Sequence, residues 1–343
     1  MNHINILKRA LNITINYRAL WIFGMLLALT TGGSGSGSNS SSSSTNSDPQ
    51  FNWQNPFSEF PQLPPEVTNM WIGIAIGLAC LVLALIVVGT IARYISETAL
   101  IRMVDEHENS GEQLTIRQGF RLGWSRMAWK MFLMDLLVGV SFVTVFLLLL
   151  ALGTLPLLVW LTKNTPLQVM GSIISAGLIL LLIFISIIAA LAVTLIMLFA
   201  RRACALENLG VRASLRRGYE MVKQRLSDTV LMGAMMFGVS LLWVLITLPI
   251  ILAVIVVAAL VAGIPALLVG SIVGFFTQGT TPWIVAAIVG TPIFLIAVII
   301  PGTLISGWQK VFSSSTWTLT YREALALEQV RVNDELPAPD STI

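Results

Sequence analysis

The sequence predicts an all-α polytopic membrane protein with six transmembrane helices, and two observations support this fold class. Hydrophobic residues make up 56% of the 343-residue chain and charged residues only 11%, whereas soluble domains carry about 25% charged residues. A chain with so little charge must expose much of its surface to lipid. In addition, nineteen of the twenty Lys and Arg residues fall in four short stretches between long apolar runs. Membrane proteins carry the charges that orient their helices at such positions.

The basic stretches also predict which way the chain crosses the membrane. They are Lys8–Arg18, Arg93–Lys130, Arg201–Arg225 and Lys310–Arg331, and Lys163 stands alone outside them. Because basic loops remain on the cytoplasmic side, we expect all four stretches, and with them both termini, to be cytoplasmic. The predicted product is a multi-pass protein of the cell membrane.

The six spans follow from the apolar runs, since a transmembrane helix needs about 20 apolar residues. In chain order, the predicted spans are Ala19–Thr31, Trp71–Ala92, Met131–Thr162, Val169–Ala200, Thr229 to about Ala258, and Trp283–Trp308. The first run is short by itself, and we expect it to continue back through Leu11, Ile13 and Ile15.

Residues 259–276 follow the fifth span and leave three alternatives open: a re-entrant piece, a helix on the outer surface, or an extension of the fifth helix. A seventh span is disfavoured because it would place the C-terminal basic stretch outside. Gly263 and Pro265 favour a bend within this segment.

The first 31 residues have a second interpretation. Lys8 and Arg9, followed by the apolar run Ala19–Thr31, resemble a signal peptide that would be cleaved. The stretch lacks a clean small-x-small cleavage site, so we favour a retained first span. The remaining topology is the same in either case, because the second span starts outside.

Two segments lie outside the predicted helices. Residues 31–69 form an outer loop whose first part is almost entirely Gly, Ser, Asn and Thr, a composition that predicts disorder. Residues 326–343 are predicted to form a flexible cytoplasmic tail. The integral membrane domain therefore covers residues 1–325.

The membrane domain is predicted to consist of three tandem helical-hairpin repeats. Each unit would contain a short surface helix, a span out, a turn and a span back, so the repeats would be parallel, about an axis along the membrane normal. Before each outgoing span, two basic residues stand nine positions apart. These pairs are Arg9 and Arg18, Arg121 and Lys130, and Arg216 and Arg225. The units would cover about residues 1–105, 112–206 and 207–325.

The short surface helices are predicted to be amphipathic. Thr115 and Gln118 form a capping-box pattern, which starts a helix at Ile116. An apolar stripe with arginines beside it suits the anionic headgroup region of a membrane; packing of the stripe on neighbouring inner helices is the alternative. The candidate headgroup contacts are Arg117, Arg121, Arg212, Arg216 and Arg217.

The chain carries no recognisable catalytic or metal-binding pattern. Its only histidines are His3 and His107, it has two cysteines, and it contains no glycine-rich phosphate loop. We therefore expect no enzymatic activity, no metal and no cofactor. The basic residues flank membrane spans, so the net charge of +3 gives no reason to expect nucleic-acid binding.

Asp135 is the candidate for an ion or proton site. It lies about one turn inside the third span, and ionisable residues inside spans often mark transport paths. The alternative is local charge balance at a helix N-terminus, with Lys130 as the partner. Pro292 and Pro301 predict a break in the last span, either a simple kink or a binding site of the kind found in transporters.

Two stretches resemble one group of bacterial membrane proteins. They are Asn16–Gly24, which leads into the Gly/Ser-rich outer loop, and Ala205–Gly218, which follows the fourth span. The group comprises the six-helix membrane domains sometimes fused to glycerophosphodiester phosphodiesterases, and their uncharacterised stand-alone relatives. The resemblance implies a bacterial inner-membrane protein. The fused enzymes carry a separate catalytic barrel with His and acidic metal ligands, which this chain lacks, so the resemblance does not extend to that activity.

These observations favour a non-catalytic membrane scaffold or lipid-interacting domain. Its partners would be membrane lipids and either another membrane protein or a second copy of the chain. The alternative is a transporter or permease for a small solute or lipid, with Asp135 and the Pro292–Pro301 segment at its centre. The sequence names no substrate, lipid class or partner.

Overall fold

The computed structural model describes residues 2–31, 65–161, 165–277 and 279–335, which form helices joined by short connections and contain no strand. The helices are α1 (His3–Asn16), α2 (Ala19–Thr30), α3 (Pro65–Ser110), α4 (Ile116–Gly123), α5 (Arg126–Thr154), the 3₁₀ helix η1 (Leu155–Leu161), α6 (Thr165–Glu207), α7 (Val211–Gln224), α8 (Leu226–Phe276) and α9 (Thr281–Glu335).

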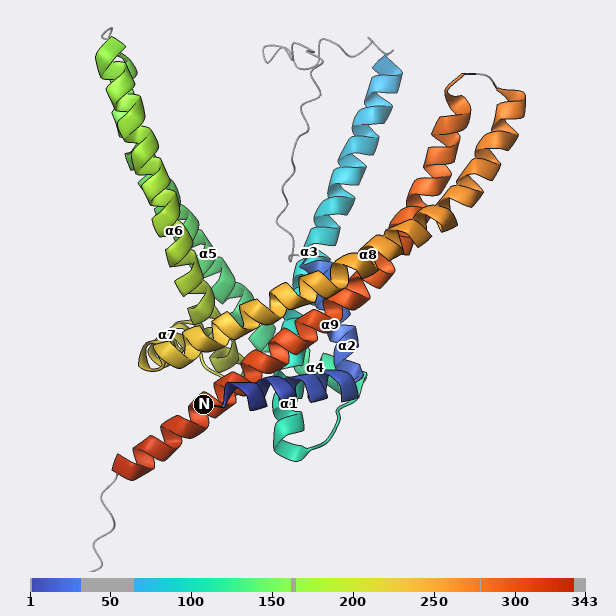
Figure 1. The fold of residues 1–343 in the computed structure, drawn as a ribbon. Helices are drawn as coiled ribbons and strands as arrows, with labels where there is room; N and C mark the ends of the chain where they lie inside the picture. Colours follow the sequence, from blue (N-terminus) through green and yellow to red (C-terminus); the bar gives the residue numbers. More distant parts are fainter. Residues whose placement is uncertain (1, 32–64, 162–164, 278, 336–343) are drawn as a thin grey trace, which may run out of the picture.

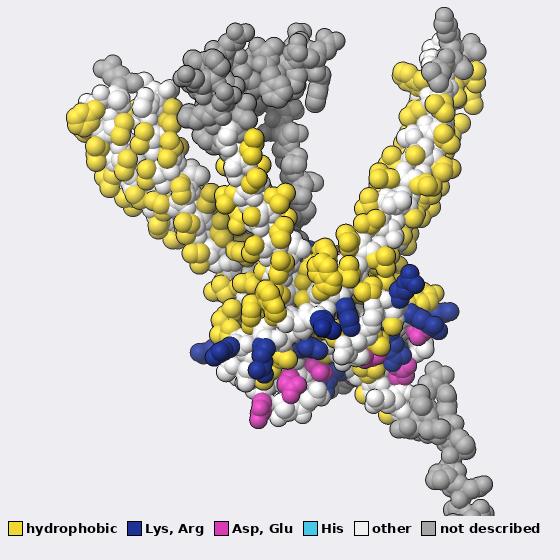
Figure 2. Space-filling model, turned by 180° about the vertical axis from the view of Figure 1, so that it is seen from behind, with side chains coloured by type: hydrophobic (Ala, Val, Ile, Leu, Met, Phe, Trp, Pro, Cys, Tyr) yellow, Lys and Arg dark blue, Asp and Glu magenta, His cyan; other side chains and the backbone are white. Residues whose placement is uncertain are grey.

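The long helices converge at one end of the molecule and spread apart at the other (Figure 1). We call the converging part the basal end; it holds α1, α4 and α7 together with the C-terminal portions of α3, α6 and α9. Three arms leave it on one side, namely α3, the α5–α6 pair and the α8–α9 pair. Figure 2 shows that apolar side chains cover the arms, whereas the charged side chains gather at the basal end.

The arms have the length and composition of membrane spans. Among the described residues, five helical segments are long and apolar enough to cross a membrane, and a sixth is obtained if α1 and α2 together count as one bent span. At most 11% of the most apolar stretch of any arm is buried inside the protein. Apolar side chains therefore face outward along the arms, which supports the predicted helical, multi-pass membrane protein.

The first predicted span does not continue back through residues 11–15, because α1 meets α2 at an angle of 97°. Two hydrogen bonds hold the corner: the Tyr17 hydroxyl donates to the Leu114 carbonyl at 3.0 Å, and the Trp21 indole N–H donates to the Thr14 carbonyl at 2.6 Å. Helix α2 has 12 residues and is about 18 Å long, shorter than the roughly 30 Å of a bilayer core.

Both short N-terminal helices contribute to the core. Ile6 and Ala10 of α1 and Leu20 and Phe23 of α2 are buried. Cleavage after residue 31 would remove these side chains from the core.

Helix α8 is continuous over 51 residues, so residues 259–276 extend the fifth helix. Gly263 and Pro265 do not interrupt it. At 1.5 Å per residue the helix is about 76 Å long, more than twice the thickness of a bilayer core. Its basal half crosses α9 obliquely before the arm rises (Figure 1), so only part of its length belongs to the arm.

Helix α9 is one helical segment through Pro292 and Pro301, so of the two predicted alternatives a simple kink fits its course and an interrupted helix does not. A proline inside a helix removes one backbone hydrogen bond and bends the axis. In a helix of 55 residues, the many remaining backbone hydrogen bonds preserve the helical path on both sides.

The boundaries of the two predicted non-helical segments also change. Residues 65–69, assigned to the outer loop, form the start of α3, and residues 32–64 lie outside the described part. Residues 326–335, assigned to the flexible tail, continue α9, and residues 336–343 lie outside the described part.

The hydrophobic core lies at the basal end. Leu100 and Met103 of α3, Ala203 of α6, and Val311 and Tyr321 of α9 are fully buried. All five lie beyond the predicted spans, which end at residues 92, 200 and 308. The three returning helices therefore continue past their apolar runs and bury their side chains against one another, where removal of apolar surface from water stabilises the fold.

The short helices pack on the returning helices through glycines. An added Cβ at Gly123 would lie 2.4 Å from the Ile95 carbonyl oxygen of α3, and one at Gly218 would lie 2.7 Å from the backbone nitrogen of Ala200 in α6. Both glycines thus permit backbone contact between helices. Helix α4 packs on α3, α7 on α6, and α1 on α9.

We expect Gly218→Ala to destabilise the protein by about 1–3 kcal/mol, because the methyl group would meet backbone atoms of α6 that cannot move aside. The measurement is the apparent Tm in detergent. Gly139→Ala in α5 is the control, since nothing lies within 4 Å of the added Cβ and alanine favours helix. An unchanged Tm for Gly218→Ala would contradict the close packing of α7 on α6.

Candidate functional site

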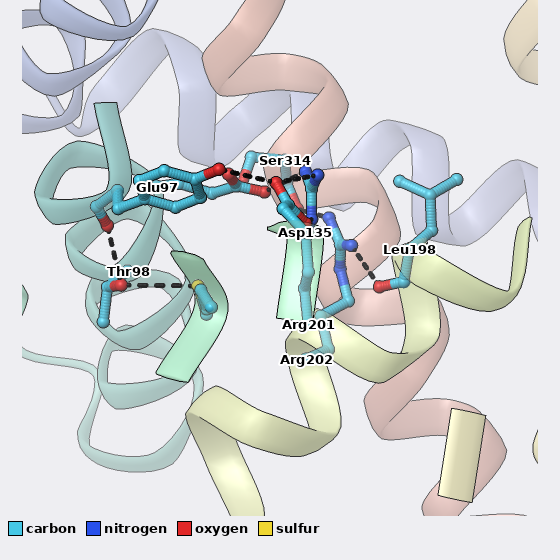
Figure 3. A network of polar contacts seen from close by, with 9 residues as sticks. Glu97, Thr98, Asp135, Leu198, Arg201, Arg202 and Ser314 are labelled. Atoms are coloured by element: carbon cyan, nitrogen blue, oxygen red, sulfur yellow. Dashed lines mark hydrogen bonds and ion pairs between the residues drawn. The ribbon is translucent and has the colours of Figure 1, made fainter. Parts of the chain in front are cut away.

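A network of charged side chains joins three helices at the basal end (Figure 3). Arg201 of α6 donates from Nη1 to Glu97 Oε1 of α3 at 2.8 Å. It also makes a two-point contact with Asp135 of α5, from Nη2 at 2.8 Å and from Nε at 3.2 Å. These side chains are largely shielded from solvent, with 14–20% of each exposed. A guanidinium matches a carboxylate in this geometry, so Arg201 fixes α3, α5 and α6 relative to one another.

Tyr94 and Arg202 extend the network. The Tyr94 hydroxyl donates to Asp135 Oδ2 at 2.9 Å. Arg202 is 4% exposed and donates from Nη1 to the Leu198 carbonyl at 2.6 Å and from Nη2 to the Ser314 carbonyl of α9 at 3.5 Å. Its Nε is buried without a hydrogen-bond partner among the described residues. The fourth helix, α9, is thereby joined to the network.

The network holds more positive than negative charge. Arg93 of α3 and Lys310 of α9 both interact electrostatically with Glu97, but no carboxylate among the described residues lies within ion-pair distance of either. The Arg93 guanidinium instead lies 5.6 Å from the centre of the Tyr94 ring. The four cations Arg93, Arg201, Arg202 and Lys310 thus face only two carboxylates, and poorly compensated charge in a shielded site is costly.

The environment of Asp135 favours charge balance over an ion site. Its carboxylate accepts hydrogen bonds from Arg201 and Tyr94. Its expected partner Lys130 lies elsewhere and donates to the backbone carbonyls of Asn208 and Leu209. In the part of the chain that the structure describes, no group of three or more His, Cys, Asp or Glu side chains is arranged to hold a metal ion.

Arg217 belongs to a second set of ion pairs at the basal end. It donates to both carboxylate oxygens of Glu328 in α9, at 2.9 and 2.7 Å, and its Nε lies 3.6 Å from Glu207 of α6. The hydrogen bond to Glu328 raises the pKa of Arg217 above its usual value. The side chain is therefore held within the protein and links three helices.

The other four predicted headgroup contacts point outward. Arg117 and Arg121 of α4 and Arg212 of α7 are exposed and make no ion pair with any described residue. The Arg216 side chain is 82% exposed and pairs only with Glu220 on its own helix. The structure thus separates the five predicted arginines into four on the surface and one, Arg217, inside.

Exposed apolar side chains accompany the surface arginines. Ile116, Phe120 and Trp124 are 45%, 46% and 65% exposed. They follow a helix that begins at Ile116, as the capping box predicts: the Gln118 side chain accepts from the Thr115 backbone N–H at 2.8 Å. The opposite side of α4, with Gly119, is packed against neighbouring helices.

Sequence reasoning missed the central network. The sequence predicts only that Arg93, Arg201, Arg202 and Lys310 are basic flanks of spans, and no local pattern distinguishes Glu97. One signal was present: residues 313–320 are rich in Ser and Thr and almost free of charge although they lie beyond the last predicted span, which indicates a buried segment. The pairing itself joins residues 66 and 104 positions apart, which no local pattern predicts.

We expect Arg201→Met to destabilise the protein by about 3–5 kcal/mol, because it leaves Glu97 and Asp135 shielded without their cation. The measurement is the apparent Tm in detergent. Adding Glu97→Gln and Asp135→Asn to this variant should recover part of the loss. Arg216→Gln, which removes an exposed pair within one helix, is the control and should leave the Tm unchanged. If the triple variant is as unstable as Arg201→Met, the uncompensated charge of the two carboxylates is not the cause of the lost stability.

Comparison with known proteins assigns the chain to a family. No curated protein and no solved structure shows significant similarity to the chain. The model of a family of unknown function, DUF7544, matches residues 14–316. The matched region contains the central network and both surface helices with exposed arginines, α4 and α7. Because the match covers most of the chain, this protein belongs to DUF7544.

Proposed function

We propose that this protein is a non-catalytic scaffold of the bacterial cell membrane whose basal surface binds anionic lipid headgroups. One observation carries the proposal: of the five predicted headgroup arginines, Arg217 is held in ion pairs with Glu328 and Glu207, whereas the other four are exposed on α4 and α7, which also expose aromatic side chains. Surfaces of this composition suit the boundary between headgroups and acyl chains.

Helix α4 illustrates the geometry. Gly119 and Gly123 face the protein, where their neighbours leave no room for a side chain. Arg117, Arg121 and the three exposed apolar residues that accompany them lie on the remaining faces. An interfacial helix inserts its apolar side chains among acyl chains while its arginines reach phosphates. Exposed tryptophan, here Trp124, is favoured at this depth.

Helix α7 supports the same interpretation. Tyr219 is exposed beside Arg212 and Arg216, and Leu226 is exposed at the start of α8. The opposite side of the helix is buried at Gly218 and Val222. Both short helices therefore combine a protein-facing glycine side with an outward face of basic and aromatic residues, to which α4 adds the aliphatic Ile116.

The basal end is proposed to face the cytoplasm. The start of α1 and the end of α9 lie there (Figure 1), and so do the basic stretches. Basic residues beside spans remain on the cytoplasmic side, where the membrane surface is anionic. The assignment to a bacterial inner membrane rests on the resemblance of Asn16–Gly24 and Ala205–Gly218 to bacterial membrane domains.

A threefold repeat is part of this proposal. The chain repeats a short helix followed by two more helices, α1–α2–α3, α4–α5–α6 and α7–α8–α9, although α2 is itself short, with 12 residues. In two units the glycine contacts correspond, since Gly123 meets Ile95 and Ala99 while Gly218 meets Ile196 and Ala200. Each short helix packs on the returning helix of the preceding unit, and α1 packs on α9, as a closed ring of three units requires.

The transport alternative would rest on Asp135 and the segment Pro292–Pro301. Asp135 is paired with Arg201, and α9 continues through both prolines, so neither feature favours a transport path. A scaffold should tolerate Asp135→Asn and Pro292→Ala with changes in stability only. A transporter would lose solute or lipid flux in proteoliposomes with either variant while remaining folded.

We expect the fourfold variant Arg117→Gln, Arg121→Gln, Arg212→Gln, Arg216→Gln to lose most of its enrichment of anionic lipids, because it removes four exposed positive charges from α4 and α7. The measurement is mass spectrometry of lipids that co-purify with the protein in native-lipid discs. The enrichment of the wild-type protein should also fall when salt is raised during purification, since exposed charges are screened.

Arg217→Gln is the matched control, since it removes the same charge from the next residue in the sequence. It should lower the apparent Tm, because Glu328 and Glu207 lose their partner, and leave lipid enrichment within twofold of the wild type. Bulk-like lipid around the wild-type protein, or equal losses for Arg217→Gln and Arg216→Gln, would argue against the proposed function.

A further inference from the structure

A cavity lies between α2, α8 and α9, and Lys310 of the central network is part of its lining. It has a volume of about 590 Å³, within the range of about 300–1,000 Å³ typical of ligand pockets. We call it the α8–α9 cavity. Its lining residues include Ser240, Thr247, Leu252 and Ile255 of α8 and Ser306 and Lys310 of α9.

One part of the cavity wall offers unused polar groups. Ser240, Ser306, Gln309 and Ser313 line the cavity, and within the described residues none of these side chains makes a hydrogen bond. Helical serines can satisfy themselves by donating to the carbonyl one turn earlier, as Ser141 does. The cavity serines do not, so their hydroxyl groups are free to bind a ligand.

Lys310 supplies a positive charge to the wall of the cavity. Its ammonium group has no carboxylate within ion-pair distance among the described residues, and it is one of the four cations that face only two carboxylates in the central network. An anion in the cavity would offset part of this excess. Lysine and hydroxyl groups together are common phosphate ligands, so the polar wall fits a phosphate group.

The remainder of the cavity fits a hydrocarbon chain. Leu248, Ile251, Leu252 and Ile255 line it along one side of α8, spaced three and four residues apart so that they share a face. Ala28 of α2 borders the same space. A free phosphate ion would contact only the polar wall of the cavity. A phospholipid would contact both the polar wall and the apolar wall.

We propose that the α8–α9 cavity is a specific site for one anionic phospholipid, with its phosphate on Lys310 and the cavity serines and an acyl chain along α8. The inference deepens the proposed function, on which it rests, by adding one built site to a surface that attracts anionic lipids in general. Lipid at this site would contact α2, α8 and α9 together.

The test is native mass spectrometry of the full-length protein, released from discs of phosphatidylglycerol and phosphatidylethanolamine and washed extensively with detergent. The wild-type protein should retain one phosphatidylglycerol molecule. Lys310→Gln should reduce the retained fraction at least tenfold, whereas Lys223→Gln, an exposed lysine on α7, should change it less than twofold.

Ser306→Phe fills the cavity without removing charge and should also reduce retention at least tenfold. This second variant keeps the proposal testable if Lys310→Gln does not fold. Retention that is unchanged by both substitutions, or that does not distinguish phosphatidylglycerol from phosphatidylethanolamine, would overturn the proposal. Displacement of the lipid by inorganic phosphate alone would identify a free-phosphate site and also overturn it.

The fourfold Arg→Gln variant separates this inference from the proposed function. It should lose the general enrichment of anionic lipids yet retain the single bound molecule. If it loses enrichment while Lys310→Gln keeps its lipid, only the specific site is wrong. If it keeps full enrichment while Lys310→Gln loses the bound lipid, the surface function is wrong and the cavity site remains.

Discussion

The ion pairs of Arg201 determine how the rest of this molecule is arranged. Its guanidinium binds Asp135 and Glu97, and so connects two of the three arms at the point where they diverge. Further out, the arms bury almost none of their apolar surface against protein. Lipid solvates such helices as well as another helix would, so no hydrophobic force draws them together. Their relative directions are therefore set at the basal end.

The basal core can serve this purpose because the returning helices continue beyond their apolar runs. There the hydrophobic effect operates as in a soluble protein, and Leu100, Val311 and Tyr321 are removed from solvent. The small residues Gly123 and Gly218 let the short helices approach the returning helices closely. Charge pairing, close backbone contact and apolar burial thus all act at the basal end, and the arms extend from it.

At the basal end, arginines that are neighbours in the sequence lie in different environments. Arg216 and Arg217 are neighbours in sequence, yet one is exposed and the other binds Glu328 and Glu207. Successive helical residues point about 100° apart, so a small rotation about the axis of α7 decides which of them meets protein and which meets solvent or headgroups. Lys310 represents a third environment, shielded but without a carboxylate, and this combination suits a cavity that receives an anionic ligand.

The sequence by itself determined the helical membrane character, the ends at which charge gathers and the start of α4 at Ile116. These properties are local: hydropathy, the spacing of basic residues and a capping box act within a few turns of helix. Only the tertiary structure decided the 97° corner between α1 and α2, the continuity of α9 through Pro292 and Pro301, and the partners of Asp135 and Arg217. The partners of Asp135 and Arg217, and the Tyr17 contact that holds the corner, join segments far apart in the chain, and no local pattern specifies which segments will meet. The continuity of α9 shows that backbone hydrogen bonds on both sides of the prolines outweigh their local effect.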